Sequence, residues 1–198
     1  MMRILIVHDQ YTDLNNGALA GEDNLVHRQI CVLRNLGHEV TKFGGSGKGI
    51  KRKFFQFRSQ VYGSDKNLLN FIKFYNPNLI LVNNLQMKTG YNWMKICKLP
   101  IVYYVHNLRW FCANAVGWRA GKSCFDCSSG KYLNAFRHRC AGIRGMLNTL
   151  RRTYFQRPQP ELTFPKRYIC ISEIFKDLLS KSVPRERISL LSNVPSFS

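Results

Sequence analysis

Acidic residues are scarce in this chain. Its 198 residues include 30 Lys and Arg but 11 Asp and Glu, which gives a formal net charge of +19 at pH 7. A charge of this size attracts phosphate groups, whether they belong to nucleic acid, lipid headgroups or nucleotides. The charge therefore favours anionic partners without choosing among them.

Long apolar runs are also missing. No stretch approaches the roughly 18 to 20 uninterrupted apolar residues of a membrane-spanning helix, so we expect any membrane contact to be peripheral. The first residues, MMRILIVHDQY, lack the long apolar core and the small-residue cleavage site of a secretory signal. The sequence therefore predicts a cytoplasmic protein.

The composition is that of a folded globular chain. Hydrophobic residues make up 45% of the sequence and aromatic residues 13%, which argues against long disordered regions. The length suits one ordinary domain, or one half of a two-domain enzyme.

Apolar runs and helical patterns alternate along the chain. RILIVH (3–8) is typical of a strand buried on both faces of a parallel sheet, and Leu25, Ile30, Leu33 and Leu36 predict a helix that stops at Gly37. Further strands are predicted in EVTKF, LILVNN, PIVYYVHN, KRYICIS and RISLLSNVP, and further helices over 65–76, 89–99, 142–157 and 173–182. Six strands alternating with helices predict a single α/β domain with a Rossmann-like, doubly wound parallel sheet.

Polar residues follow several of these predicted strands. The loop from Asn16 to Asp23, the pair Asn83 and Asn84, His106 and Ser172 all fall at carboxyl ends. Because doubly wound sheets bind ligands at the carboxyl ends of their strands, we expect these residues to border one crevice.

Four segments together resemble the amino-terminal domain of GT-B glycosyltransferases of group 1, also called family 4. They are RILIVHDQY...AGEDNLVHRQICVLRNLGHEV, PNLILVNN, LPIVYYVHNLRWFC and ICISEIFKDLLSK...ERISLLSNVP. The resemblance spans nearly all of the chain, and the sequence also looks like a subset that carries a cysteine-bearing insertion after the strand ending in His-Asn. It implies an acceptor-binding first domain, a second domain that grips a nucleotide sugar, and catalysis in the cleft between them.

The resemblance also predicts the organisation of the protein. Residues 1–198 would form the amino-terminal domain, with the cysteine-rich insertion at about 107–140. The sequence stops at NVPSFS, where such enzymes cross into the second domain, so we expect the nucleotide-sugar-binding domain to be absent. The implied reaction is sugar transfer with retention, without a required catalytic metal or other cofactor, onto a lipid-linked or other saccharide acceptor in cell-surface polysaccharide synthesis. The isolated domain is expected to be inactive.

His106 is the residue to which the resemblance gives a catalytic role. A lone histidine is more often structural, but at this strand end in the family it contacts the transferred sugar, where it would steady oxocarbenium-like charge. The implied substrate-binding residues are Ala20, Gly21, Glu22, Asn84, Asn107 and Ser172.

Two of these positions depart from the family pattern. Ala20 and Gly21 keep only one of two adjacent glycines, and from the residues alone this loop reads equally well as a turn with a helix cap. Asn83 and Asn84 replace a His-Asn pair, which keeps hydrogen bonding and removes a titratable group.

Seven cysteines are present, and four of them follow the pattern C-x11-C-x2-C-x12-C at Cys112, Cys124, Cys127 and Cys140. This spacing is compatible with a structural zinc site, with His138 as a substitute ligand, but it is less specific than two C-x2-C pairs. Reduced buried cysteines or a disulfide remain alternatives. We expect Lys122, Arg137 and Arg139 to lower the pKa of the thiols. Cys31, Cys97 and Cys170 lie on apolar faces of predicted helices or strands, so we expect them to be core residues.

Two basic stretches combine cations with apolar side chains: KGIKRKFFQFR and RGMLNTLRRTYFQR. Such runs are usually solvated faces, but they also suit docking on an anionic membrane surface, where a lipid-linked acceptor would be found. The alternative function is a basic, zinc-containing nucleic-acid-binding module. The alternation of strands and helices disfavours that alternative.

Overall fold

A computed structural model describes residues 1–8, 21–44, 66–83, 85, 93–108, 111–112, 116–128, 131, 133–140 and 164–191. The chain divides into two compact units, 1–104 and 105–198, which are described in turn.

The architecture is a Rossmann-like α/β fold built on six strands. The sheet has the order β2-β1-β3-β4-β7-β8, and the pairings of β1 with β2, β1 with β3, β3 with β4 and β7 with β8 are parallel. The predicted fold class is therefore confirmed. After β1 the chain first adds β2 on one side and then crosses to place β3 on the other side. The topological switch point of the sheet therefore lies between β1 and β3.

The first unit is organised around β1 (Arg3–His8). This strand lies between β2 (Glu39–Gly44) and β3 (Leu79–Asn83), with His8 in register with both Gly44 and Asn83. Beyond β3 lies β4 (Ile101–Val105), whose Tyr104 is in register with Asn83. The carboxyl ends of β1, β3 and β4 therefore lie at one edge.

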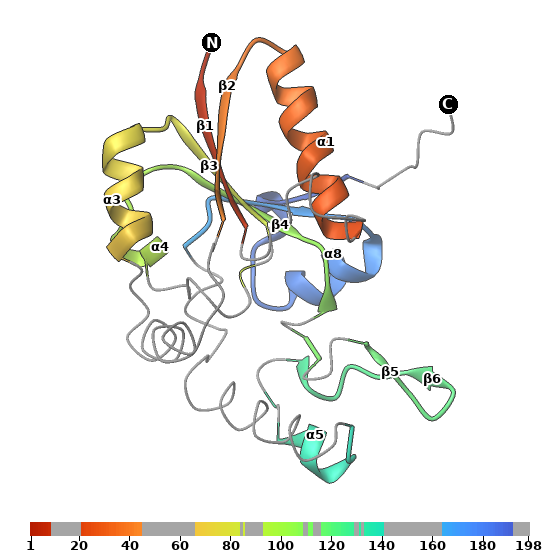
Figure 1. Cartoon of the computed structure of the whole chain (residues 1–198). Coiled ribbons are helices and arrows are strands. Elements are labelled where there is room, and N and C mark those ends of the chain that lie inside the picture. The colour runs from red at the N-terminus through yellow and green to blue at the C-terminus, as the bar shows by residue number, and fades with distance from the viewer. Residues whose placement is uncertain are drawn as a thin grey trace, which may run out of the picture. The chain divides into compact units, whose positions relative to one another are not determined.

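Two helices cover opposite sides of these strands (Figure 1): α1 (Gly21–Asn35) and α3 (Lys66–Tyr75). Ile4 and Ile6 of β1 share a buried cluster with Val26 and Ile30 of α1. Alternate side chains of a strand point to opposite faces, so Leu5 and its neighbours at odd positions face the other way, and Leu5 is also fully buried. An apolar run without alternation is what a strand covered on both faces requires.

Helix ends in this unit follow the predicted stop signals. Gly37 has a φ of +80°, a left-handed conformation that suits glycine after α1, and its amide donates to the Arg34 carbonyl at 2.9 Å. Asn76 ends α3 with a φ of +48°, and Pro77 prevents the helix from continuing.

The second unit contains β7 (Arg167–Cys170), α8 (Glu173–Ser180), the 3-10 turn Arg185–Arg187 and β8 (Ile188–Leu190). Tyr168 and Leu179 are fully buried in it. A separate segment carries the two-residue strands β5 (Trp118–Arg119) and β6 (Lys122–Ser123) and the four-residue helix α5 (Asn134–Arg137).

The structure corrects two of the predicted helices. The buried stripe of α1 is Val26, Ile30 and the half-buried Leu33, whereas Leu36 lies beyond the helix and is 67% exposed. The predicted helix 89–99 is helical over Trp93–Ile96 (α4) within its described part, because residues 97–99 leave the helix before Pro100. The predicted helix 142–157 and the basic stretch KGIKRKFFQFR (48–58) lie outside the described residues.

We expect the stability of this fold to depend on β1. Replacing Ile6, which is 0% exposed, with Ala should lower the free energy of unfolding by about 2 to 5 kcal/mol, because the cavity cannot fully collapse. Val32→Ala, at a position 56% exposed on α1, should change it by about 0.5 kcal/mol or less. Urea unfolding followed by far-ultraviolet circular dichroism measures both. Equal effects would contradict the central position of β1.

Candidate functional site

Buried polar side chains gather at the carboxyl ends of β1 and β3. His8 is 3% exposed and Asn83 is 0% exposed, and the two residues are register partners on adjacent strands. A buried imidazole beside a buried amide is unusual in a strand core, because each polar group must find a partner there. The position is the topological switch point, where this class of sheet binds its ligands.

Helix α1 supplies the partners of both side chains. Asp23, 4% exposed, places its Oδ1 3.8 Å from His8 Nδ1, which makes an ion pair when the imidazole is protonated. Asn83 Nδ2 donates to Gln29 Oε1 at 2.9 Å. The helix that follows β1 therefore fixes the polar groups at the ends of two strands. The cluster therefore places an imidazole, a carboxylate and two side-chain amides at the carboxyl ends of β1 and β3.

The predicted loop residues are described only in part. Gly21 begins α1 and Glu22 is its second residue, so both stand at the helix start that follows β1. Ala20 and Asn84 lie outside the described residues. The binding roles of all four remain predictions.

His106 and Asn107 directly follow β4 and are half-buried. Tyr104, two residues before His106, is in register with Asn83, so the chain reaches His106 as it leaves the edge where β3 also ends. The predicted strand-end position of His106 is confirmed, and its catalytic role remains a prediction.

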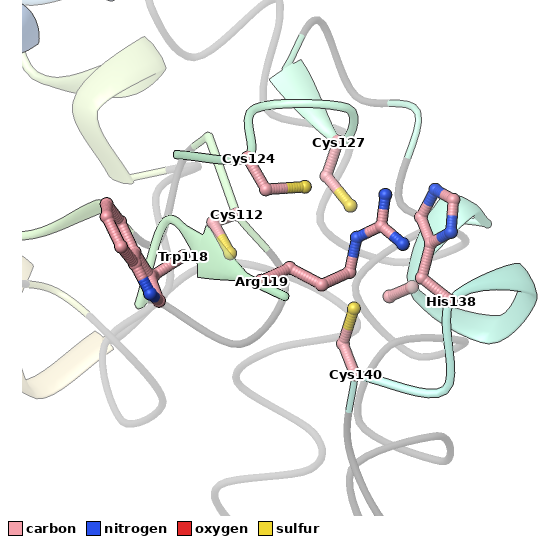
Figure 2. Close-up of a pocket in the computed structure, with 8 residues that line it drawn as sticks. Cys112, Trp118, Arg119, Cys124, Cys127, His138 and Cys140 are labelled. Atoms are coloured by element: carbon pink, nitrogen blue, oxygen red, sulfur yellow. The ribbon is translucent and has the colours of Figure 1, made fainter. Parts of the chain in front are cut away.

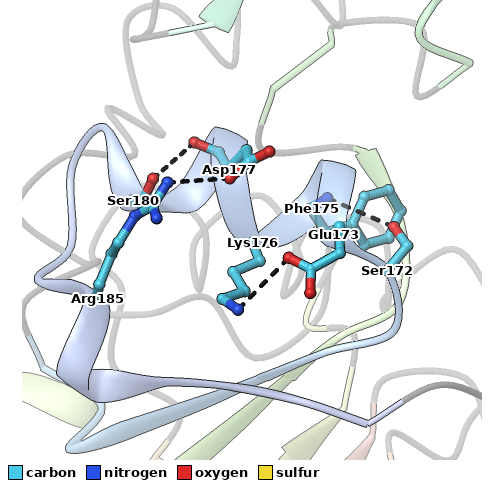
Figure 3. Close-up of polar contacts among 7 residues, drawn as sticks. All are labelled: Ser172, Glu173, Phe175, Lys176, Asp177, Ser180 and Arg185. Carbon is cyan, nitrogen blue, oxygen red and sulfur yellow. Dashed lines mark hydrogen bonds and ion pairs between the residues drawn. The ribbon is translucent and has the colours of Figure 1, made fainter.

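Ser172 has a structural task in the fold (Figure 3). It is the N-cap of α8, with extended backbone, and its Oγ accepts a hydrogen bond from the Phe175 amide at 3.4 Å. Further polar contacts hold the helix: Lys176 Nζ lies 3.4 Å from Glu173 Oε2, and Arg185 Nη2 lies 3.2 Å from Asp177 Oδ1. The capping bond explains a serine here without a ligand.

The four cysteines of the spaced pattern line one pocket (Figure 2). Cys112, Cys124, Cys127 and Cys140 surround it together with Trp118, Arg119, Ala135 and His138. Residues from four places along 28 positions of sequence thus converge, although the two intervals that flank the C-x2-C pair are long. The structure therefore brings together the four cysteines that the sequence pattern singled out: Cys112, Cys124, Cys127 and Cys140. In the arrangement described, no group of three or more His, Cys, Asp or Glu side chains is drawn close enough to hold a metal ion.

Arg119 is the cation at this pocket. Figure 2 shows its side chain extending among the sulfurs, and a hydrogen bond with the Cys124 sulfur raises the pKa of the guanidinium. Asp126 lies at the outer side, with its Oδ2 3.5 Å from Arg119 Nη2 and 3.0 Å from His138 Nε2. His138 is therefore paired with a carboxylate.

The expected effect of cations on the thiols is wrong for Cys140. Burial, followed by the neighbouring Cys124 and Cys112, raises the pKa of Cys140, and Arg119 opposes this rise. Lys122, Arg137 and Arg139 are exposed side chains, and they are not among the causes of the shift. Desolvation of a thiolate therefore exceeds the attraction of nearby positive charge at this site.

The remaining cysteines behave differently from one another. Cys170 is fully buried, and burial raises the pKa of its thiol to about 11, which confirms a core residue. Cys97 is half-buried, and burial raises its pKa as well. The prediction for Cys31 is wrong: it is exposed, because it follows Ile30 in α1 and so points about 100° away from the buried stripe.

Comparison with known proteins adds no family assignment: no family model matches the chain, and no curated protein matches it. No helix among the described residues is long and apolar enough to cross a membrane.

Sequence reasoning placed Asp23 at the expected crevice but missed His8 and Gln29 of the strand-end cluster and Arg119 of the cysteine pocket. His8 closes the first apolar run, so its strand-end position was readable, whereas Gln29 lies in a helix and gives no local signal. Arg119 is one of many cations in the sequence. Arg119 reaches the pocket because it lies in β5, which pairs with β6 in a short hairpin.

A double-mutant cycle tests the polar contact between β3 and α1. Asn83→Ala and Gln29→Ala each remove one partner of the hydrogen bond and leave the other partner unsatisfied, so the two losses of unfolding free energy should not add. We expect a coupling energy of about 0.5 to 3 kcal/mol from urea unfolding of the single and double variants. Additivity within about 0.5 kcal/mol would show that the contact contributes nothing.

The cap of α8 gives a second test. Ser172→Ala should lower the free energy of unfolding by about 0.5 to 2 kcal/mol, whereas Ser172→Asp should retain most of it because aspartate also caps helices. Ser182→Ala, at an exposed position after the helix, is the matched control and should be close to neutral. Thermal unfolding of the four proteins measures this. If alanine and aspartate destabilise equally, Ser172 does not act as a cap.

Proposed function

We propose that this chain is the acceptor-side domain of a GT-B glycosyltransferase that acts in cell-surface polysaccharide synthesis. The observation that carries the proposal is the set of buried polar side chains at the switch point of a Rossmann-like parallel sheet, next to the strand end that leads into His106 and Asn107. The motifs that resemble this family, notably the strand ending in His-Asn, support the same reading.

The chemistry proposed for this edge is hydrogen bonding to sugar hydroxyls. His106 would hydrogen-bond the transferred sugar and steady the oxocarbenium-like charge that develops when the bond to the leaving diphosphate breaks. Asn107, which follows it and is half-buried, would bind the acceptor through its amide, which both donates and accepts. The nucleotide diphosphate would be held by a second lobe, as in the family that the chain resembles.

The acceptor proposed is a saccharide linked to a polyprenyl diphosphate, presented at a membrane surface. The net charge of +19 supports this choice, because an anionic leaflet attracts basic proteins by about 1 kcal/mol for each Lys or Arg near the surface. The basic stretches that would make this contact lie outside the described residues.

A binding experiment tests the acceptor role of Asn107. The chain should co-sediment with neutral vesicles that contain a polyprenyl-diphosphate-linked saccharide more strongly than with the same vesicles without it. Asn107→Ala should weaken that difference about five- to tenfold, the effect of one lost hydrogen bond. Asn35→Ala, at the exposed end of α1, is the matched control and should bind as the original chain does.

Two results would overturn the proposal. One is vesicle binding that does not depend on the saccharide lipid in the original chain. The other is tighter binding to duplex DNA at the same ionic strength, which would favour the nucleic-acid-binding alternative.

A further inference from the structure

The described residues of the segment from Cys112 to Cys140 form a very small hydrophobic core. Among its described residues the buried hydrophobic ones are Cys127 and Ala135, with the half-buried Cys140 packed against them. Val116, Trp118 and Leu133 are each more than half exposed. Burial of so little apolar surface cannot offset the conformational entropy that the described residues of this segment lose on folding.

Its secondary structure is equally short. β5 and β6 contain two residues each, and α5 contains four, whereas isolated hairpins and helices of this size are not stable in water. The hairpin also includes Ala120 at a φ of +49°, a left-handed conformation that is unfavourable for alanine. The segment therefore requires a further source of stability.

We propose that a single Zn²⁺, bound by the thiolates of Cys112, Cys124, Cys127 and Cys140, supplies that stability. Four thiolates are a common ligand set of structural zinc, and small domains with such a site gain their folding free energy from the metal. The four side chains line one pocket, and Figure 2 shows their sulfurs around the side chain of Arg119. The site is structural, since four protein ligands leave no position for a water molecule.

The backbone around the cysteines prepares this site. The hairpin turn Ala120–Gly121 joins Arg119 to Lys122, and the chain then enters the C-x2-C pair directly after β6. The Gly117 amide donates to Cys112 Sγ at 3.4 Å, and the Cys124 amide donates to the Gly117 carbonyl at 2.8 Å. An N–H group bonded to a ligand sulfur orients it and stabilises negative charge on it.

Gly117 is itself required by this geometry. Its φ is +65°, and a Cβ at this position would stand 2.4 Å from Leu108 Cδ1. A side chain here would require the end of the Leu108 side chain to move, and it would be strained in this backbone conformation. The glycine therefore brings the two ends of the C-x11-C interval together.

Metal binding requires the Arg119 side chain to move, whereas His138 can stay where it is. The guanidinium extends among the sulfurs, so it must leave for the four thiolates to close on one ion. Its side chain is 37% exposed and already lies 3.5 Å from Asp126, which offers it a partner outside the pocket. His138 keeps its contact with Asp126 at 3.0 Å, and we therefore assign it no place among the ligands.

The metal would also anchor the chain that leaves β4. The amides of Phe111 and Cys112 both donate to the Leu108 carbonyl, at 2.9 Å and 2.7 Å, and Phe111 is 4% exposed. Fixing Cys112 therefore limits the motion of the turn that begins immediately after Asn107.

Metal analysis tests the proposal. The chain purified under reducing conditions without chelator should contain about one zinc per molecule. Replacement by Co²⁺ should give the thiolate charge-transfer and tetrahedral ligand-field bands of a four-sulfur site, and His138→Ala should leave those bands unchanged. A sample without zinc that binds no Co²⁺, or an intact mass that shows two disulfides in place of the metal, would overturn the proposal.

Substitutions identify the ligands. Cys124→Ser and Cys127→Ser should each lower zinc affinity at least tenfold, whereas Cys31→Ser and Cys97→Ser, outside the pocket, should retain one zinc per chain. Equal loss in the control variants, or full zinc content in the pocket variants, would refute this ligand set.

Hydrogen exchange keeps the test decisive even if the pocket variants fold poorly, because it uses the unaltered chain. Removal of zinc by a chelator should speed amide exchange across residues 112–140 at least tenfold, while exchange in β1 (Arg3–His8) should change little. If exchange in residues 112–140 is the same with and without zinc, the metal does not stabilise the segment.

Discussion

The parallel pairing of β1 with both β2 and β3 is the constraint on which the first unit depends. Each residue from Ile4 to Val7 is buried, and the strand has hydrogen-bonded neighbours on both sides, so these four residues are shielded from solvent. Because the three strands are in register, their carboxyl ends come together. His8 therefore lies beside Asn83. Helix α1, which starts close to the same edge, supplies a partner for each of them: Asp23 for His8 and Gln29 for Asn83.

The cysteine-bearing segment is held by different forces. Around β1 the stabilising term is the removal of apolar surface from water, whereas between Cys112 and Cys140 two buried hydrophobic residues are described. Polar contacts such as the Asp126 pairs with Arg119 and His138 lie at a half-exposed carboxylate and contribute little in water. In our proposal, the stability of this segment depends on the chemical state of its four thiols.

The fold was largely readable because its signals are local. RILIVH and LILVNN are continuous apolar runs, and Gly37 and Pro77 end the helices that precede two strands. The errors concern side chains at the margin of a pattern. Cys31 follows Ile30 in α1, and one step along a helix turns a side chain by about 100°, enough to move it from the core to solvent. Leu36 keeps helical spacing but lies past the last residue of α1 and is exposed.

The sequence by itself determined the class of fold, the strand ends at which polar residues would stand, and which four cysteines share a spaced pattern. Tertiary structure alone decided that Asp23 and Gln29 meet His8 and Asn83, that Ser172 caps a helix, and that Arg119 points among the sulfurs. The reason is physical: apolar periodicity and turn residues act over a few neighbouring positions. Contacts between residues 15 or 54 positions apart depend instead on how strands and helices pack, and that packing leaves no mark in the local sequence.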